Sequence, residues 1–329
     1  MRKSKWTGFR SPLAEPINAY LKYKRALCKK YVTQEQSLRV FDAYLVETGL
    51  TTIDEITTQV VDKFFANRPP SRPNTHNQLI GSLRRLFQWM LSQGMLSESP
   101  LRSTRKRRAT EELKPYIFSS DEVKRLLVMS GQLRNTTSNA RGRASKYRMI
   151  FTLAYGLGLR VGEISALRVG DVDVKQAVLT IKQSKFGKTR LVPMGPKLAH
   201  QLSEFLDEFC SQDNSDPVFS ILGDKRAMSR TTITVVFHQL VLKMGLQPSG
   251  GERSPRLHDL RHSFAVNTFL RLYREGKDPS QQLLQLSTFL GHSKLQHTTV
   301  YLSMTDELLN EANSRFYKFA AATLQEVAP

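Results

Sequence analysis

A run of basic residues at 102–108 divides a chain whose other long stretches carry apolar residues at helical spacing. The run reads Arg-Ser-Thr-Arg-Lys-Arg-Arg and holds no apolar side chain that could enter a core. A chain of 329 residues is long enough for about two domains, each with its own hydrophobic core. We therefore predict a helical domain at 11–101 and a second domain at 115–329, joined by a basic linker at 102–114.

Four stretches of the first domain have apolar residues that recur at i, i+3 and i+4, and they predict a compact four-helix bundle. Gly49 and Gly94 are expected to end two of the helices, because glycine accepts the left-handed conformation that closes a helix. Thr33 with Gln36 predicts a capping box at the start of the second helix. The remaining signals are a helix at 16–26, Thr57 as a cap, Pro69-Pro70 as a stop and Asn74 or Thr75 as the last helix start.

The second domain combines helices with a short β-hairpin. Ser119 or Ser120 is expected to cap its first helix, and the polar stretch 131–147 is expected to be an inserted loop. Two short β-prone runs, 178–182 and 190–193, flank a turn that contains Lys185 and Lys188, which predicts the hairpin. Helices are expected at 149–157, 161–167, 196–211, 230–244, 258–273, 281–290 and 305–325. The predicted fold class is mainly α with a small β-hairpin or sheet.

The charge balance indicates an anionic partner. The chain has 49 Lys+Arg against 29 Asp+Glu, a net charge of +20, and both predicted domains share the excess. A field of this size favours a polyanion such as nucleic acid, although a solvated surface that only aids solubility is the alternative. The basic residues expected to contact phosphates lie on the polar side of the last bundle helix and in the linker: Arg84, Arg85, Arg105, Lys106, Arg107 and Arg108.

Several other classes of protein are excluded or disfavoured. No apolar run approaches the roughly 18–20 residues of a membrane span, and no apolar segment follows the basic residues of the N-terminus. Cys28 and Cys210 are too few for a disulfide scaffold or a four-cysteine metal site. We therefore expect a cytoplasmic protein without membrane contact.

The segment Leu257-His-Asp-Leu-Arg-His262 is the first chemical motif. On a helix, His258, Arg261 and His262 lie at i, i+3 and i+4 and share one face. An arginine fork matches two phosphate oxygens, and a histidine can donate a hydrogen bond or a proton. The alternative is a surface helix with Asp259 in a salt bridge. The two histidines also resemble half a zinc site, but no glutamate stands between them and no third ligand is evident, so no metal is expected.

Two further segments carry cationic side chains. Gly156-Leu-Gly-Leu-Arg-Val-Gly-Glu places Arg160 at a helix start, where Glu163 can hold it as an ion pair. Lys185 lies on the predicted hairpin turn, where it is either simply exposed or able to protonate a leaving oxygen as a general acid.

The last segment, 290–301, contains Gly-His-Ser and a tyrosine nine residues after the histidine. A single tyrosine near a C-terminus is often a packing residue. His292 and Tyr301 in one segment with Thr298-Thr299 between them favour a chemical role instead.

These segments together resemble the tyrosine recombinase (phage integrase) family over nearly the whole chain. The resemblance implies a SAM-like four-helix core-binding domain before an α+β catalytic domain. It implies a catalytic set of Arg160, Lys185, His258, Arg261, His292 and Tyr301. Lys188 and Tyr317 are the alternatives for the lysine and the tyrosine. The long 131–147 stretch departs from the family's spacing but removes no motif.

The resemblance also implies a reaction. The tyrosine would attack a DNA phosphate to give a 3′-phosphotyrosyl linkage, without metal, ATP or any other cofactor, and four protomers would exchange strands of two duplexes through a Holliday junction. The segment 305–325 would contact a neighbouring protomer, unless its apolar stripe packs into its own core. A type IB topoisomerase and a non-catalytic DNA-binding regulator are the competing interpretations.

Within the family, the bundle begins almost at the N-terminus and leaves only a basic tail at 1–10. We therefore expect a simple Xer-like or transposon-borne bacterial enzyme, associated with the nucleoid, without an arm-binding domain. The direction of its reaction, whether integration, excision, inversion or resolution, stays open.

Overall fold

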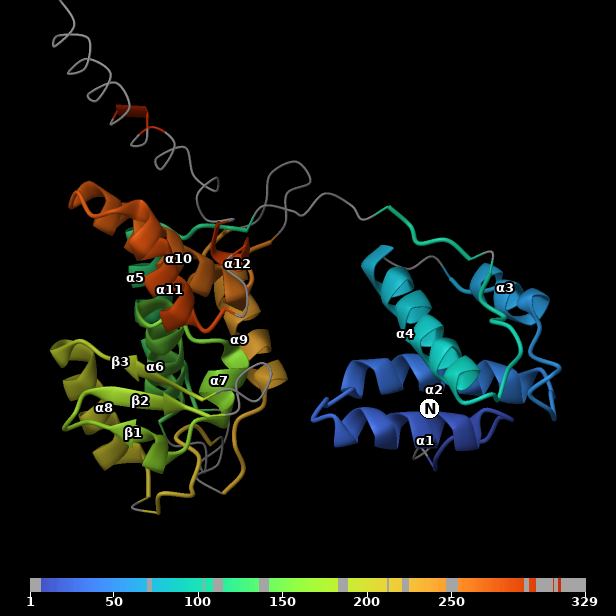
Figure 1. Cartoon of the computed structure of the whole chain (residues 1–329). Helices are drawn as coiled ribbons and strands as arrows, with labels where there is room; N and C mark the ends of the chain where they lie inside the picture. Colours follow the sequence, from blue (N-terminus) through green and yellow to red (C-terminus); the bar gives the residue numbers. More distant parts are fainter. Residues whose placement is uncertain are drawn as a thin grey trace, which may run out of the picture. The chain divides into compact units, whose positions relative to one another are not determined.

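The structure is a computed structural model. It describes residues 7–69, 73–102, 104–108, 115–135, 142–182, 189–211, 213–220, 225–246, 254–292 and 296–299, with residues 310, 313 and 314. The chain forms two compact units, Met1–Glu112 and Leu113–Pro329 (Figure 1). Within the described ranges, none of the helices has the length and apolar character needed to cross a bilayer.

Unit 1 is a four-helix bundle. Its helices are α1 (Ala14–Ala26), α2 (Val32–Glu47), α3 (Thr58–Ala66) and α4 (Pro73–Ser92). Aromatic rings join them in the core, where Phe41 contacts Phe64 at 4.9 Å and Phe87 at 6.1 Å between ring centroids. Asp42 is buried and accepts hydrogen bonds from the backbone N–H groups of Arg10 and Ser11, so the chain entering α1 is bound to α2. The predicted bundle is confirmed.

The predicted capping box at Thr33 is wrong. Helix α2 begins at Val32, and its N-cap is Tyr31 in the left-handed conformation (φ 49°), without a side-chain capping bond. The physical reason is a tertiary contact, because the Tyr31 hydroxyl lies 3.0 Å from the Tyr20 hydroxyl and the two rings pack edge to face. That contact fixes where the chain enters α2. The last helix also begins slightly earlier than expected, with Pro73 in its first turn, where its missing N–H has no cost.

Unit 2 contains eight helices among the described residues, a 3₁₀ turn and a small sheet. The helices are α5 (Ser120–Gly131), α6 (Arg143–Gly156), α7 (Val161–Ala166), α8 (Pro196–Phe209), α9 (Arg230–Lys243), α10 (Leu257–Arg274), α11 (Pro279–Leu290) and α12 (Gln296–Thr299). The 3₁₀ turn is Val169–Asp171. The strands β1 (Val172–Asp173), β2 (Val178–Ile181) and β3 (Arg190–Pro193) form an antiparallel sheet in the order β1-β2-β3. Leu179 pairs with Val192 across β2 and β3, and both are fully buried. The mainly helical fold with a small sheet is confirmed.

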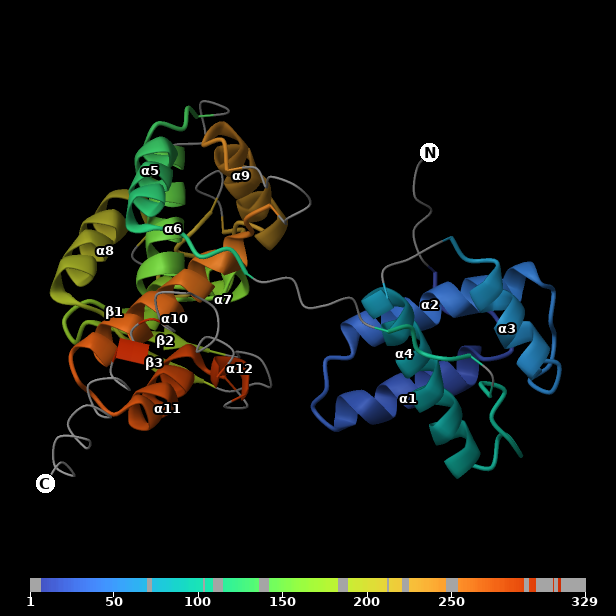
Figure 2. The same cartoon turned by 90° about the horizontal axis from the view of Figure 1, so that it is seen from above.

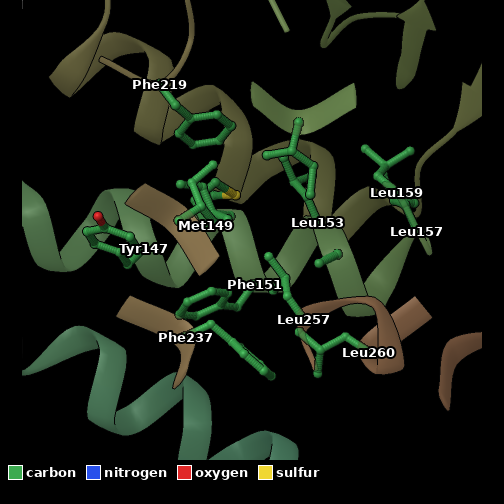
Figure 3. Close-up of a cluster of buried hydrophobic side chains, with 14 of the residues drawn as sticks. Tyr147, Met149, Phe151, Leu153, Leu157, Leu159, Phe219, Phe237, Leu257 and Leu260 are labelled. Carbon is green, nitrogen blue, oxygen red and sulfur yellow. The ribbon is translucent and has the colours of Figure 1, made fainter. Parts of the chain in front are cut away.

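Helix α6 runs through the core of unit 2. Figure 3 shows Phe151 of α6 beside Phe237 of α9, with Leu257 of α10 next to them. The two phenylalanine rings are 5.8 Å apart and pack edge to face. Because Leu257 and Leu260 belong to this same core, the first turn of α10 is held against α6. His258 and Arg261, the two ends of the His-x-x-Arg motif, directly follow Leu257 and Leu260 on this helix.

The predicted loop at 131–147 is partly wrong. Helix α6 begins at Arg143, about two turns before the expected start at Met149, and both Lys146 and Tyr147 are buried. The Arg143 guanidinium lies over the Tyr147 ring at 5.5 Å. The polar composition therefore belongs to a helix whose long side chains cover buried rings, which composition alone did not indicate. Residues 136–141 lie outside the described residues.

Helices α10 and α11 form a second packed layer of unit 2 (Figure 2). Buried side chains on both helices form one cluster, which includes Phe269 of α10 and Leu290 at the end of α11. This packing brings the end of α11 to the face of α10 that carries Arg261. The predicted helix at 305–325 lies outside the described residues, apart from residues 310, 313 and 314, so it stays a prediction.

Candidate active site

Arg160 is held at the start of α7 by its own helix. The backbone N–H of Arg160 donates to Glu163 Oε2 at 3.0 Å, and its Nη1 donates to Glu163 Oε1 at 2.9 Å. A carboxylate three residues into a helix satisfies an N–H that would otherwise lack a helical partner. The Arg160 side chain remains 25% exposed, so part of its guanidinium faces solvent.

Arg261 is in a different environment, because it is 1% exposed. Its Nη1 donates to the carbonyl of Gly158 at 2.7 Å, and its Nη2 donates to the carbonyl of Leu290 at 2.6 Å. A buried guanidinium therefore joins the loop before α7 to the end of α11.

The end of α11 is the point at which the candidate residues meet. Arg160 donates from Nη1 to the Leu290 carbonyl at 3.5 Å and from Nη2 to the Gly291 carbonyl at 3.3 Å. Both candidate arginines thus contact the Leu290 carbonyl. The last carbonyls of a helix carry partial negative charge, which favours these cations.

His292 follows this helix end directly. Gly291 takes the left-handed conformation (φ 67°) that ends α11, and the His292 N–H donates to the Ser287 carbonyl at 3.0 Å. The imidazole Nδ1 lies 2.7 Å from the Thr298 hydroxyl, so the backbone and the ring of His292 are each fixed by a hydrogen bond. The structure therefore brings Arg160, Arg261 and His292 together, although more than 100 residues separate Arg160 from the other two.

His258 and His262 lie one turn apart on α10, with ring centroids 4.7 Å apart. Desolvation by the surrounding protein atoms is the largest cause that holds the pKa of His258 well below its usual value, and repulsion between its protonated ring and His262, Arg261 and Arg160 lowers that pKa further. Desolvation is also the largest cause of the lowered pKa of His262, about 4, which Asp259 partly opposes. Both rings are neutral at pH 7 and can accept as well as donate a hydrogen bond.

The ion pair considered for Asp259 is present. Asp259 is 2% exposed and accepts the backbone N–H of Arg256 at 2.7 Å and its Nη2 at 3.1 Å. This pair orients the start of α10, and it occurs together with the histidine and arginine cluster on the same helix.

Sequence reasoning missed Arg190. The guanidinium of this residue, the first of β3, binds both oxygens of Glu163 at 2.9 Å, and its Nε donates to the Phe289 carbonyl at 3.0 Å. Burial alone would raise the pKa of Glu163, but the hydrogen bonds from Arg190 and from the Arg160 backbone lower it to about 2. The alternation of side chains along a strand could have indicated it, because Arg190 shares the inward face of β3 with the buried Val192.

Four candidate residues lie outside the described residues, so their roles stay predictions: Lys185, Lys188, Tyr301 and Tyr317. Within the described ranges, no group of three His, Cys, Asp or Glu side chains could hold a metal ion.

Residues 104–108, the described part of the basic linker with Arg102, belong to unit 1. Their backbone is bound to α4, because Asn77 exchanges two hydrogen bonds of 2.8 Å with the N–H and carbonyl of Arg107. Thr104 adds a 2.9 Å bond to Asp62 of α3. The side chains of residues 105–108 are exposed, as is Arg85, while Arg84 is half-buried. The basic side chains therefore form an exposed row on a backbone that is fixed to the bundle.

Gly158 is a point of close packing, and its substitution gives a first prediction. It has φ 59°, and an added Cβ would lie 2.6 Å from Phe264 Cδ1 and 2.9 Å from Leu290 Cδ2. We expect Gly158→Ala to lower the free energy of unfolding by about 2–4 kcal/mol, because backbone strain adds to overpacking. Urea denaturation measures the loss.

Gly245→Ala is the matched control for that substitution. Gly245 has a similar φ of 72° but no atom within 4 Å of an added Cβ, so only the backbone strain remains. Equal losses in the two variants would contradict close packing at Gly158.

Solved structures share this fold. The Tn1549 transposon integrase in complex with transposon right end DNA superposes with a TM-score of 0.64 at 16% identity, over 93% of this chain and 98% of that one. A lambda integrase tetramer bound to a Holliday junction gives 0.61 at 18% identity, over 90% and 78%. The fold is that of the tyrosine recombinases.

Sequence comparison gives the family. The phage integrase family model matches residues 117–307. A putative integrase/recombinase, y4rB of Sinorhizobium fredii, is 32% identical over 93% of this chain and 97% of its own length. Tyrosine recombinase XerD of Lacticaseibacillus casei is 26% identical over 88% and 93%. The chain belongs to the phage integrase family and is a tyrosine-type site-specific DNA recombinase.

Proposed function

We propose that this protein cleaves and rejoins DNA strands through a 3′-phosphotyrosyl intermediate, with Tyr301 as the nucleophile. The observation that supports the proposal best is the convergence of Arg160 and Arg261 on the Leu290 carbonyl, two residues before His292. Cations that already meet at a partly negative oxygen are arranged to receive the oxygens of a phosphate.

The two arginines would stabilise the charge on the non-bridging oxygens of the phosphate. A tyrosine phenol has a pKa near 10 and is a weak nucleophile at neutral pH. Neighbouring guanidinium groups favour the phenolate and stabilise the charge that develops in the pentavalent transition state. Arg160, whose side chain is partly exposed, would contact the phosphate directly, and Arg261 would act from the floor of the site.

Proton transfers complete the proposed step. The Tyr301 oxygen forms a bond to phosphorus, the bond from phosphorus to the 5′ oxygen breaks, and Lys185 protonates the leaving oxygen, with Lys188 as the alternative donor. His258 would take the tyrosine proton, and His258 and His292 would hydrogen-bond the phosphate. The phosphotyrosine keeps the energy of the phosphodiester, so a second 5′-hydroxyl can reverse the step without ATP or metal.

Double-stranded DNA with short core sites is the proposed partner, bound by both units. Unit 1 would act as the core-binding domain through Arg84, Arg85 and the exposed row at 105–108. We propose a homo-tetramer on two duplexes, with the segment 305–325 contacting the neighbouring protomer. The support for this assembly is the fold shared with the lambda integrase that forms a tetramer on a Holliday junction.

Covalent capture tests the proposal. The full chain is incubated in EDTA with a library of duplexes that have a randomised core and a nick near the cleavage position, so that the cleaved end diffuses away. Adducts that survive denaturation are recovered, the DNA is sequenced and the attached peptide is mapped. We expect adducts at Tyr301. When the sequenced sites are then supplied as intact duplexes, we expect products that join two of them.

Attachment at another residue, or no adduct, would contradict the proposal. Relaxation of one supercoiled duplex without any joining of two duplexes would indicate a topoisomerase instead.

The exposed row at 105–108 gives a second prediction. Replacing all four residues by alanine should weaken duplex binding and reduce the slope of log K against log salt by about 3.6, since each neutralised phosphate contributes about 0.9. Fluorescence anisotropy over a salt series measures the slope. The charge-conserving control, Arg105→Lys with Arg107→Lys and Arg108→Lys, should keep it, and an unchanged slope in the alanine variant would exclude these contacts.

A further inference from the structure

Arg190 connects three elements around the candidate site. It starts β3, binds both oxygens of Glu163 in α7 and donates to the Phe289 carbonyl at the end of α11. Its side chain is 12% exposed, and an added Cβ at Gly291 would lie 3.1 Å from its Cδ and Nη1. The guanidinium is therefore packed against the helix end that precedes His292.

Glu163 is shared between two arginines. Its Oε1 accepts Arg160 Nη1 and Arg190 Nη1, each at 2.9 Å, and its Oε2 accepts Arg190 Nη2 and the Arg160 N–H. The carboxylate side chain is 6% exposed, so water screens its charge weakly. The three side chains together carry a net charge of +1.

The consequence concerns Arg160. If Glu163 had no other cation, it would neutralise Arg160, and a phosphate would have to compete with a buried carboxylate for the same guanidinium. The bidentate bond from Arg190 offsets the carboxylate instead. Arg160 then keeps its positive charge for a second anion while Glu163 still fixes its orientation.

We propose that Arg190 is a positioning residue that balances the charge of Glu163 and so keeps Arg160 available to the scissile phosphate. The proposal rests on the proposed function, because it assigns Arg160 to the phosphate. Two effects would distinguish this role from a purely structural one. The loss of Arg190 should slow cleavage most when the scissile phosphate is charged, and removing the Glu163 charge should restore part of the cleavage rate.

The experiment measures single-turnover cleavage of a captured duplex that has either the normal phosphodiester or an uncharged methylphosphonate at the scissile position. Wild type, Arg190→Met, Arg190→Lys, Glu163→Gln and the double variant Arg190→Met/Glu163→Gln are compared. The ratio of the two rates is taken within each preparation, so the fraction of folded protein cancels. Arg168→Met, an exposed arginine of the same unit, controls for the loss of one positive charge.

We expect Arg190→Met to slow phosphodiester cleavage about 10²-fold, on the scale of losing one oxyanion donor, and to slow methylphosphonate cleavage much less. Arg190→Lys should be intermediate, because it keeps the charge but not the two parallel bonds. The double variant should cleave the phosphodiester faster than Arg190→Met, and Arg168→Met should keep the wild-type ratio.

Two results would overturn the proposal: an unchanged rate ratio in Arg190→Met, or a double variant no faster than Arg190→Met. The failure of the proposed function is a separate result, since wild type itself would then form no Tyr301 adduct.

Discussion

Replacing Tyr301 by phenylalanine is expected to abolish the covalent protein–DNA adduct and to leave duplex binding unchanged. The substitution removes only the phenolic oxygen that would attack phosphorus and keeps the aromatic ring. Without a nucleophile, the arginines can still bind the phosphate but cannot form the linkage. Adducts are counted on a denaturing gel with captured duplexes, and binding is measured by fluorescence anisotropy.

Tyr317→Phe is the matched control, because it makes the same change in the alternative tyrosine. It should form adducts at the wild-type rate. An undiminished adduct in Tyr301→Phe, or the loss of the adduct in Tyr317→Phe, would refute the assignment of the nucleophile.

Arg261→Met is expected to have the second-largest effect, on stability and cleavage together. The buried guanidinium is the donor to the carbonyls of Gly158 and Leu290, and methionine leaves both without these bonds. We expect the free energy of unfolding to fall by about 3 kcal/mol, given the cost of losing two hydrogen bonds from a charged donor to buried carbonyls. Cleavage by the folded fraction should slow about 10²–10³-fold through the loss of transition-state stabilisation.

Arg160→Met separates these two effects. The Arg160 side chain is 25% exposed, and its bonds to the end of α11 are long, at 3.3 and 3.5 Å. Its loss should therefore slow cleavage to a similar degree at a smaller cost in stability. Urea denaturation and single-turnover cleavage are measured on both variants, and equal stability losses would contradict the different burial of the two arginines.

Local signals in the sequence predicted most of the helices. Ser119 caps α5 through a capping box with Glu122, as one of the two expected caps, and the hairpin strands lie within a residue of the expected runs. These features depend on side chains three or four residues apart, or on strict alternation, which a sequence displays directly. The starts of α2 and α6 were not predicted, because Tyr31 packs against Tyr20 of α1 and Tyr147 is buried in the core of unit 2, which the local pattern does not show.

The family and the residue types of the candidate site could be read from the amino-acid sequence. The motifs around Arg160, His258, Arg261 and His292 are contiguous, and each can be recognised alone. The burial of Arg261, the partial exposure of Arg160 and the sharing of Glu163 with Arg190 became evident from the folded chain. Those bonds join segments 27 to 131 residues apart. Their geometry follows from the packing of α10 and α11 and the placement of β3, which no local spacing encodes.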